Sequence, residues 1–584
     1  MLTFSRQRYR LDGTWRMAPD PFDLCEQKAI WEAHDTADEL SDRVPAEWPE
    51  VQVPSCWNAA WDELEYYEGP VWYWRRFRFE ARRSQRYLLH FEAANYSTKV
   101  WVNGRFVGEN EGGFTPFWFD ITEQLAASNT ILVKVDARRR ADGVPALVYD
   151  WFNFGGITRP VSIVTVPESH IRNFRVSTRL DGARTFVRFD VWTEGPAGGH
   201  VRIKIPEVNF EDALPCARGG HCSAEFEIYP DLWSPDNPRL YTVELLYGSD
   251  RVSDAVGFRE LGVQDDEILL NGKPVRLYGI CLHEEADRSG RTLTERDVAQ
   301  RFRWARELHA SFLRLAHYPH TEQMARTADR LGFLLWEEIP VYWEIAFTSK
   351  ATLANAKRQM RLLVERDWNR ASVAFWSIGN ETDAARRGRN AFMGALADFT
   401  RKLDPTRLVT AACSLRRTDP GHVALDDPLA AKLDVIGINE YFGWYVGAVE
   451  DFAGWQPGRR ETKPIIISET GADAVAGHHG AKGVRWTEEF QADFHRRQLA
   501  VLDALPGVRG IAPWLLFDFR SPLRTNRYQR GYNRKGLISN AGNKKLAFGV
   551  LAGFYAGKRG IKGHVPPARS GGGRPRRGRG VRGL

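Results

Sequence analysis

The chain has 584 residues, of which 43% are hydrophobic and 12% aromatic, so its composition excludes a disordered or fibrous protein and supplies several globular cores. The formal net charge of +7 lies at the C-terminal end, because nine Lys or Arg and no Asp or Glu occur from Lys558 onward, which leaves −2 for the rest. The sequence has no run of about 18 apolar residues and no signal-peptide core near Met1. We therefore expect a soluble, cytoplasmic protein with no membrane partner.

Residues 1–165 are predicted to form a β-sandwich, because short runs of alternating apolar and polar residues lie between turn signals. Lys99–Val102 is one such run, and Asn103-Gly104 after it predicts a two-residue hairpin that continues at Arg105. The later segment Tyr149–Ile157 departs from alternation and is predicted to be a functional loop.

Residues 166–264 are predicted to form a second, smaller β-sandwich. Period-two runs recur there, as in Phe186–Val191 and Val201–Ile205, over a length suited to one immunoglobulin-like unit. No chemistry-bearing cluster occurs in this segment, so we interpret it as a spacer.

Residues 265–557 change pattern, because short apolar runs now alternate with helical stretches of about 10 to 15 residues. This alternation predicts a (β/α)₈ barrel. Amphipathic helices are expected at Asn355–Asp367 and Asn390–Leu403. The eight expected strands are Val275–Cys281, Phe312–Ala316, Phe333–Glu337, Val373–Ile378, Leu408–Ala412, Val435–Ile438, Ile465–Ser468 and Gly510–Leu516.

The segment 558–584 is rich in Gly and Arg, lacks apolar periodicity and is predicted to be disordered. Such a tail can bind nucleic acid. We favour a solvated extension, or a cloning or reading-frame artefact, and expect no nucleic-acid partner. The six cysteines contain no CxxC pair, so no metal site is predicted.

Two apolar, β-branched runs lead to a glutamate: Glu381 in the stretch Ser372–Asp383, and Glu469 in the stretch Pro464–Ala472. In a parallel barrel the carboxyl ends of all strands open onto one face, so these two carboxyl groups can meet there. A single strand-end glutamate often serves as an ion-pair partner. A pair of them indicates acid/base chemistry on a glycosidic bond.

The motifs WSIGNE, ending at Glu381, and IIISETG, containing Glu469, resemble those of glycoside hydrolase family 2. Further resemblances are WYWRRF from Trp72, KVWVNG from Lys99, LWSPDNPRLY from Leu232 and RLAHYP from Arg314, over about residues 8 to 555. The resemblance implies a jelly-roll, sugar-binding-like sandwich, an immunoglobulin-like sandwich and a TIM barrel. It also implies a retaining exo-β-glycosidase with Glu469 as nucleophile and Glu381 as acid/base, without metal or cofactor. The partners that it implies are a glycoside substrate and further copies of the chain in a homo-oligomer.

Within that family the closest resemblance is to β-glucuronidases, which implies hydrolysis of terminal β-D-glucuronides. Lys is a point charge suited to a uronate carboxylate, and an amide adds a donor. The residues that the resemblance and the strand ends together suggest for substrate binding are Asp150, His283, His317, Asn380, Asn439, Tyr441, Tyr445, Trp514, Arg530, Asn533 and Lys535. Several of them also have a plain structural interpretation: Asp150 as a turn-former, Tyr441 and Tyr445 as packing residues, His283 and His317 as structural histidines, and Lys535 as a solvated loop cation.

The sequence departs from the β-glucuronidase pattern at Gln529, where an arginine precedes the Asn533-Arg-Lys535 motif in that branch. A β-galactosidase or β-galacturonidase therefore stays open as an alternative. A non-catalytic carbohydrate-binding protein is a further alternative, which the presence of both glutamates disfavours. The short stretch Trp343–Ala354 leaves no length for a long lid, so we expect an open pocket that admits varied aglycones.

Overall fold

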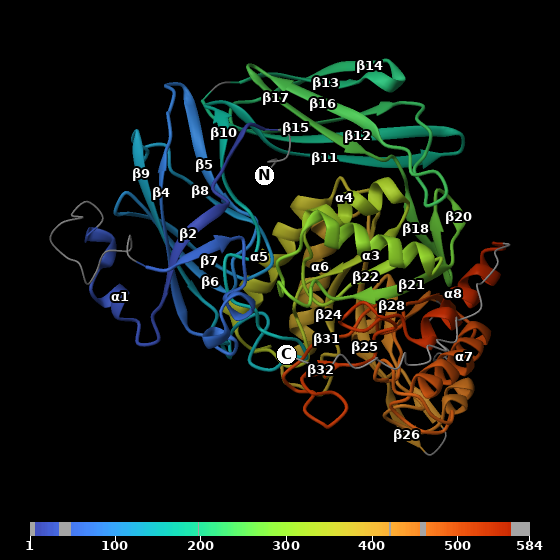
Figure 1. Ribbon diagram of the computed structural model, residues 1–584. Helices are drawn as coiled ribbons and strands as arrows, with labels where there is room; N and C mark the ends of the chain where they lie inside the picture. Colours follow the sequence, from blue (N-terminus) through green and yellow to red (C-terminus); the bar gives the residue numbers. More distant parts are fainter. Residues whose placement is uncertain (1–5, 34–47, 197, 420–421, 456–462, 562–584) are drawn as a thin grey trace, which may run out of the picture.

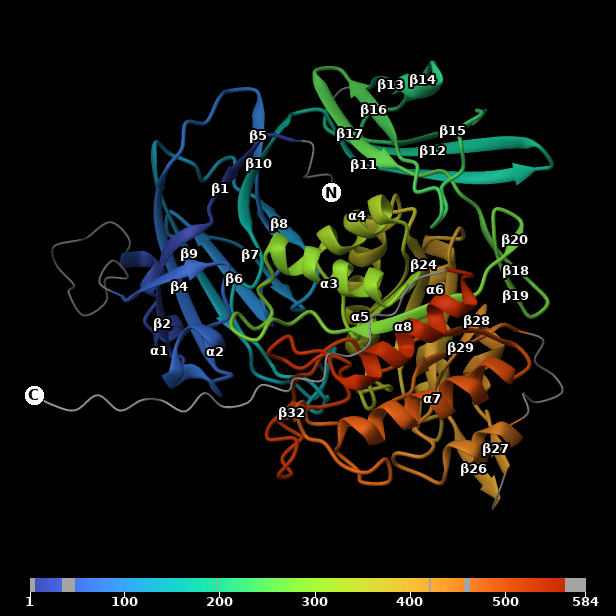
Figure 2. The same ribbon diagram turned by 45° about the vertical axis from the view of Figure 1, so that its right-hand side comes forward.

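The computed structural model describes residues 6–33, 48–196, 198–419, 422–455 and 463–561. Two β-sandwiches lie against a closed barrel, the first beside it and the second across its top in Figure 1. Figure 2 shows the same arrangement with the last helices brought forward. The predicted three-part fold is confirmed. Most of the predicted disordered tail lies outside the described residues, which end three residues after helix α8 (Leu546–Lys558).

The first sandwich consists of a four-stranded and a six-stranded sheet, which bury a shared apolar core that includes Trp15, Tyr73 and Leu89. All strand pairs in it are antiparallel, so inward and outward side chains alternate. The four-stranded sheet has the order β1 (Arg8–Arg10), β10 (Val161–Pro167), β5 (Gln85–Phe91), β8 (Phe117–Asp120). The six-stranded sheet has the order β3 (Glu50–Val53), β2 (Gly13–Pro19), β4 (Pro70–Arg78), β9 (Ser128–Asp136), β6 (Ser97–Val102), β7 (Arg105–Glu111).

The predicted hairpin joins β6 and β7. Asn103 has φ 49° and Gly104 has φ 75°, the left-handed pair that a tight two-residue turn requires. The predicted loop is also observed, because residues 149–157 contain no strand beyond one isolated bridge of Gly156 to Asn95. Two short helices, α1 (Leu24–Gln27) and α2 (Trp57–Ala60), complete the described part of this sandwich.

The second sandwich packs a three-stranded sheet on a four-stranded one around an apolar core that includes Phe174, Phe189 and Leu245. The first sheet has the order β11 (His170–Asp181), β12 (Arg184–Glu194), β15 (His221–Glu227). The second has the order β14 (Phe210–Cys216), β13 (Gly199–Ile205), β16 (Tyr241–Tyr247), β17 (Asp250–Val256). A small sheet of β18 (Leu261–Gln264), β19 (Glu267–Leu270) and β20 (Lys273–Pro274) leads into the barrel.

The barrel closes through eight parallel strands, as predicted. Their side chains are almost all buried, which explains why the sequence shows continuous apolar runs instead of alternation. The strands are β21 (Leu277–Leu282), β22 (Phe312–Leu315), β23 (Leu334–Glu338), β24 (Val373–Asn380), β25 (Leu408–Ser414), β28 (Val435–Asn439), β29 (Ile465–Glu469) and β30 (Val508–Ile511). The last strand ends five residues before the predicted Leu516.

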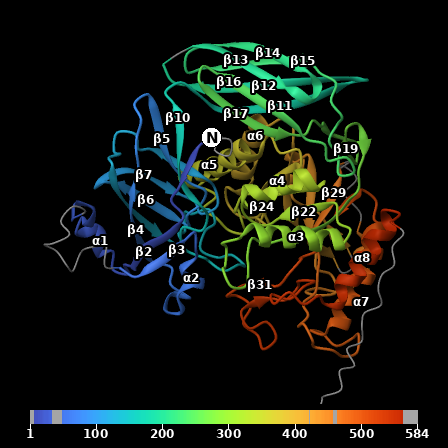
Figure 3. The same cartoon turned by 45° about the horizontal axis from the view of Figure 1, so that its top comes forward.

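Six α-helices in the described part of the chain cover the outside of the barrel, and Figure 3 shows α7 and α8 together on one side. They are α3 (Glu295–Glu307), α4 (Glu322–Leu331), α5 (Lys350–Asp367), α6 (Arg389–Leu403), α7 (Glu488–Ala504) and α8. The described connections after β25 and β28 differ from the expected helices of about 10 to 15 residues. The connection after β25 contains a hairpin of β26 (Arg416–Asp419) and β27 (His422–Ala424) and a 3₁₀ turn at Pro428–Lys432. The connection after β28 contains a 3₁₀ turn at Val449–Gly454. Among the described helices, none is both long and apolar enough to cross a membrane.

Buried ion pairs join both sandwiches to the barrel. Arg159 of the first sandwich donates to Glu284 at 2.5 Å and to the Pro319 carbonyl at 2.8 Å. Arg370, after α5, bonds Asp254 of the second sandwich and Asp329 of α4. Because buried charges are stable only when paired, these contacts fix the position of each sandwich and so of the loop 149–157 over the barrel mouth.

Candidate active site

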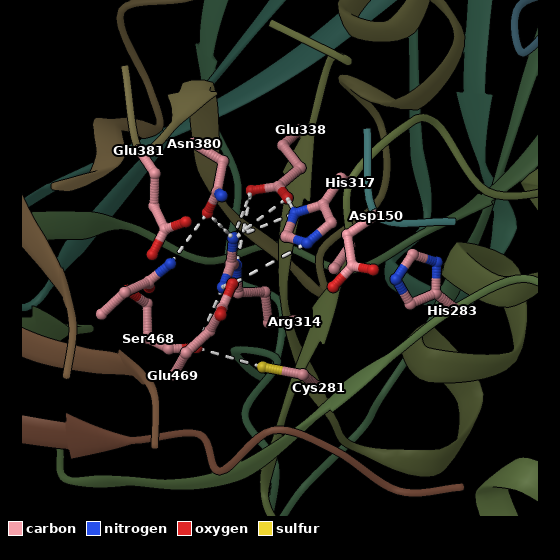
Figure 4. Close-up of polar contacts among 12 residues, drawn as sticks. Asp150, Cys281, His283, Arg314, His317, Glu338, Asn380, Glu381, Ser468 and Glu469 are labelled. Carbon is pink, nitrogen blue, oxygen red and sulfur yellow. Dashed lines mark hydrogen bonds and ion pairs between the residues drawn. The ribbon is translucent and has the colours of Figure 1, made fainter. Parts of the chain in front are cut away.

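Arg314 on β22 is the hub of a polar cluster at the carboxyl end of the barrel (Figure 4). Its fully buried guanidinium donates to Glu469 Oε1 at 2.7 Å, to Asn380 Oδ1 at 2.7 Å and to Glu338 Oε1 at 3.1 Å. Burial lowers the pKa of Arg314, but the carboxylates of Glu338 and Glu469 outweigh this effect and hold the pKa above its usual value. The cluster therefore contains one permanent positive charge between two carboxylates.

Glu469 ends β29 and has both carboxyl oxygens held. Oε1 accepts from Arg314, and Oε2 accepts from the Tyr441 hydroxyl at 2.6 Å. The side chain is only 5% exposed. Hydrogen bonds to both oxygens fix the direction of this carboxyl group, as a nucleophile requires.

Glu381 follows β24 directly and lies beside this cluster. Its backbone has φ 48°, an uncommon conformation for a residue with a side chain, and its amide donates to the Ala412 carbonyl at 2.8 Å. The Trp343 indole donates to Glu381 Oε2 at 2.9 Å. Burial, together with the negative charge of Glu469, raises the pKa of Glu381 above its usual range. The structure thus gives the two glutamates different electrostatic surroundings, as an acid and a nucleophile need.

An amide network lies between the two glutamates. Asn380 Oδ1 accepts from Asn439 Nδ2 at 3.1 Å, and Ser468 Oγ donates to Asn439 Oδ1 at 2.7 Å. Asn380 Nδ2 is buried, and no described residue accepts a hydrogen bond from it. This NH₂ group therefore keeps unused donor capacity among the described residues.

Aromatic rings form the floor next to Arg314. The His317 ring stacks on Trp514 with centroids 4.8 Å apart, and its Nδ1 lies 2.7 Å from Glu338 Oε1. His283 stacks on Phe519 at 4.0 Å, with Nδ1 3.1 Å from the Tyr318 hydroxyl. Burial and the neighbouring His317 lower the pKa of His283 far below its usual value, so His283 is neutral. The predicted residues His283, His317 and Trp514 are therefore brought together.

The predicted lysine lies at a second polar cluster. Lys535 Nζ lies 2.8 Å from Asp473 Oδ2 and donates to the Tyr445 hydroxyl at 2.7 Å. Burial lowers the pKa of Lys535, but Asp473 and Tyr445 outweigh it, so the pKa is raised and the ammonium stays charged. Asn533 Oδ1 accepts from the Lys535 backbone amide at 3.2 Å and so shapes the turn that carries this lysine.

Asp150, from the first sandwich, reaches this cluster through Arg524. Arg524 Nε lies 3.1 Å from each Asp150 carboxyl oxygen, and its Nη1 donates to the same Tyr445 hydroxyl at 2.9 Å. The Ser521 hydroxyl donates to Asp150 Oδ1 at 2.5 Å. Two cations, Arg524 and Lys535, therefore converge on one phenol oxygen.

A substrate-binding role for Arg530 stays a prediction. Its side chain is exposed and its Nε donates to the Arg527 carbonyl at 3.0 Å. Gln529 is buried, and its amide lies 3.3 Å from Asp473 Oδ1. The loop turns so that Arg524, six residues earlier, carries its guanidinium inward instead.

Sequence reasoning assigned no role to Arg314, Glu338, Trp343, Asp473 and Arg524. A charge inside the apolar run Phe312–Leu315, and paired glutamates at the end of β23, were signals for Arg314 and Glu338, since unpaired charges are not buried in strands. The other residues lie in irregular loops, where periodicity gives no signal. Among the described residues, no group of three or more His, Cys, Asp or Glu side chains is arranged to hold a metal ion.

Comparison with known proteins follows the same division of the chain. Residues 9–167 match the sugar-binding domain of the family 2 glycosyl hydrolases, residues 169–259 match a further family 2 model, and residues 261–504 match the family 2 TIM barrel domain. The β-glucuronidase of Canis lupus familiaris is 30% identical over 94% of this chain and 91% of its own length.

Solved structures share the whole architecture. The β-glucuronidase of Bifidobacterium dentium, complexed with coumarin-3-O-glucuronide, has a TM-score of 0.84 and 27% identity over 95% of this chain and 98% of its own. A β-galacturonidase from Eisenbergiella tayi bound to galacturonate has a TM-score of 0.82 over 95% of this chain and 98% of its own, but at 23% identity this likeness concerns the fold alone.

Proposed function

Because this chain belongs to glycoside hydrolase family 2 and is β-glucuronidase-like, we propose that it is a retaining exo-β-glycosidase that hydrolyses terminal β-D-glucuronides. The observation that carries the proposal is the contrast between its two glutamates. Glu469 is held by Arg314 and Tyr441, whereas the pKa of Glu381 is raised by burial and by Glu469. The first glutamate is then an ionised nucleophile and the second a protonated acid.

In the first step, Glu469 attacks the anomeric carbon and the bond to the leaving oxygen breaks. Glu381 gives its proton to that oxygen, so the aglycone leaves as a neutral alcohol and the sugar stays bound to Glu469 as an ester. The Trp343 indole, 2.9 Å from Oε2, orients the acid. The Asn380 NH₂ group is placed for a sugar hydroxyl.

In the second step, Glu381 is ionised and takes a proton from a water molecule, whose oxygen attacks the anomeric carbon. The ester bond to Glu469 breaks, and the carboxylate regains its charge. Arg314 and the Tyr441 hydroxyl stabilise this returning charge through their bonds to the two oxygens. Two displacements restore the β configuration.

The substrate carboxylate is proposed to lie beside Lys535, Arg524 and Tyr445. A buried ammonium and a guanidinium that meet at one hydroxyl are suited to an anionic group. Asp150, held by Arg524 and Ser521, then faces a sugar hydroxyl as an acceptor. Asn439 and Tyr441 support the glutamates from the end of β28.

A β-galacturonidase or β-galactosidase is the second candidate. Gln529 donates a hydrogen bond to Asp473 at the position where β-glucuronidases carry an arginine. Each of the two inward cations, Lys535 and Arg524, is already paired with an aspartate.

We also propose that the chain is cytoplasmic, binds no nucleic acid and forms a homo-oligomer. Its proposed domains are residues 1–165, 166–264 and 265–557. Light scattering on the purified full chain, with and without residues 558–584, tests the assembly.

A panel of 4-nitrophenyl β-D-glucuronide, β-D-galacturonide and β-D-galactoside tests the function. We expect wild type to hydrolyse the glucuronide fastest, Lys535→Ala to lose uronide hydrolysis selectively, and Glu469→Gln to lose turnover on all substrates. Hydrolysis of only the neutral galactoside would refute the role of Lys535. A Glu469→Gln variant with the wild-type rate would refute the assignment of the nucleophile.

A further inference from the structure

A hollow opens beside Glu381, which is one of its lining residues. It is lined by Ala141 and Ala146–Val148 of the first sandwich, by the segment after β23 that includes Trp343 and Ile345, and by Glu381 itself. A general acid must lie against the leaving oxygen. On the proposed function, the group attached to that oxygen therefore extends into this hollow.

The wall formed by the first sandwich is apolar. Leu147 and Val148 are consecutive, and they are 48% and 54% exposed. Ala146 and Ile345 continue the apolar surface across the hollow. Two adjacent, exposed aliphatic side chains at the edge of a hollow are typical of a surface that a ligand covers.

Hydrogen bonds to helix α5 hold this wall in place. Gln359 Nε2 donates to the Val144 carbonyl at 2.8 Å, and Thr352 Oγ1 donates to the Asp142 carbonyl at 2.9 Å. Arg139 Nη1 donates to the Leu147 carbonyl at 3.2 Å. A wall fixed before the ligand arrives loses little conformational entropy on binding.

The charged side chains of the hollow are carboxylates. Glu344 and Asp383 line it together with Glu381, and Arg386 forms ion pairs with Glu344 and, at 3.9 Å, with Asp383, so that one cation faces two carboxylates. An anionic aglycone would meet like charges here, and a sugar aglycone would find few side-chain donors on the aliphatic wall. A flat, uncharged aromatic group fits both the apolar wall and the Trp343 ring.

We propose that Leu147 and Val148, which form the apolar wall of this hollow, are specificity-determining residues that make this chain prefer uncharged aryl aglycones. The inference rests on the proposed function, since Glu381 must be the acid for the hollow to receive the leaving group. It predicts that affinity rises with the flat apolar area of the aglycone, at constant glycone.

Binding to the inactive Glu469→Gln chain separates the two claims, because affinity is then independent of leaving-group reactivity. Calorimetry would measure the Kd of methyl, 4-nitrophenyl and 4-methylumbelliferyl β-D-glucuronides. The same three β-D-galacturonides test the inference on the second candidate sugar. We expect Leu147→Ser/Val148→Ser to weaken binding of the 4-methylumbelliferyl glycoside about tenfold. The Kd of the methyl glycoside should stay within about twofold.

Leu546→Ser is the matched control, because Leu546 begins α8 on the barrel exterior and is 38% exposed. It should leave all Kd values unchanged. Equal weakening of methyl and aryl glycosides by the double variant, or no weakening of either, would overturn the inference while the proposed function stands. No binding of either glycone series would refute the proposed function and the inference together.

Discussion

Replacing Tyr441 with Phe isolates the second chemical step. The change removes one hydroxyl and, with it, the 2.6 Å bond to Glu469 Oε2, while the ring and the Arg314 bond to Oε1 stay. Glu469 loses charge when the sugar ester forms and regains it when the ester is hydrolysed. The lost bond therefore slows the second step, because only that step returns charge to the oxygen.

The expected size follows from the type of bond. A hydrogen bond to a charged group contributes about 1.5 to 3 kcal/mol. At about 1.4 kcal/mol for each factor of ten, kcat should fall about 10-fold to 150-fold.

Stopped-flow release of 4-nitrophenol from the aryl glucuronide is the assay. We expect a burst equal to the enzyme concentration, followed by a slow steady rate, since the ester accumulates. Tyr229→Phe, at a tyrosine 70% exposed on the second sandwich, is the control and should behave as wild type. A kcat within twofold of wild type, or a slow rate without a burst, would refute the reasoning.

Three other variants test separate parts of the site and fold. Trp343→Phe removes a hydrogen bond that favours the ionised form of Glu381, so the pKa of Glu381 should rise. Because the protonated form of Glu381 is the active one, the alkaline limb of the pH profile of kcat/KM should move to higher pH. A move to lower pH would contradict this. Arg524→Met removes one positive charge, so KM should rise more for β-D-glucuronides than for β-D-galactosides, whereas an equal rise would argue against a carboxylate contact. Arg370→Met leaves Asp254 and Asp329 without their shared cation. A denaturant titration should show that the free energy of unfolding is lower by about 3 to 5 kcal/mol. An unchanged unfolding midpoint would show that these ion pairs do not stabilise the domain junction.

The sequence predicted the barrel well, because fully buried parallel strands leave continuous apolar runs. All eight runs overlap observed strands. The eighth strand was predicted to extend too far, since Trp514 and Leu516 are as buried as strand residues. Their backbone amides, however, donate outside the strand ladder, to the Thr470 and Cys281 carbonyls at 2.9 Å each. The 3₁₀ connections were missed because such short turns have no amphipathic period.

The site was predictable where its residues end strands, and not where they lie in loops. Glu381, Glu469 and Asn439 follow apolar runs, so the barrel topology brings them to one face. The loop after β30 carries several arginines, and no sequence pattern distinguishes Arg524, which faces inward, from Arg530, which does not. Only the fold of that loop decides which guanidinium reaches Asp150.

Trapping the covalent intermediate tests the central claim most directly. A 2-deoxy-2-fluoro-β-D-glucuronosyl fluoride has a good leaving group, while its fluorine destabilises both transition states, so the sugar ester should persist. Mass spectrometry of peptides from the treated full chain should then find the sugar on Glu469, and find none in Glu469→Gln. An adduct on another carboxyl group, or turnover of the β-D-glucuronide with inversion and no adduct, would contradict the account.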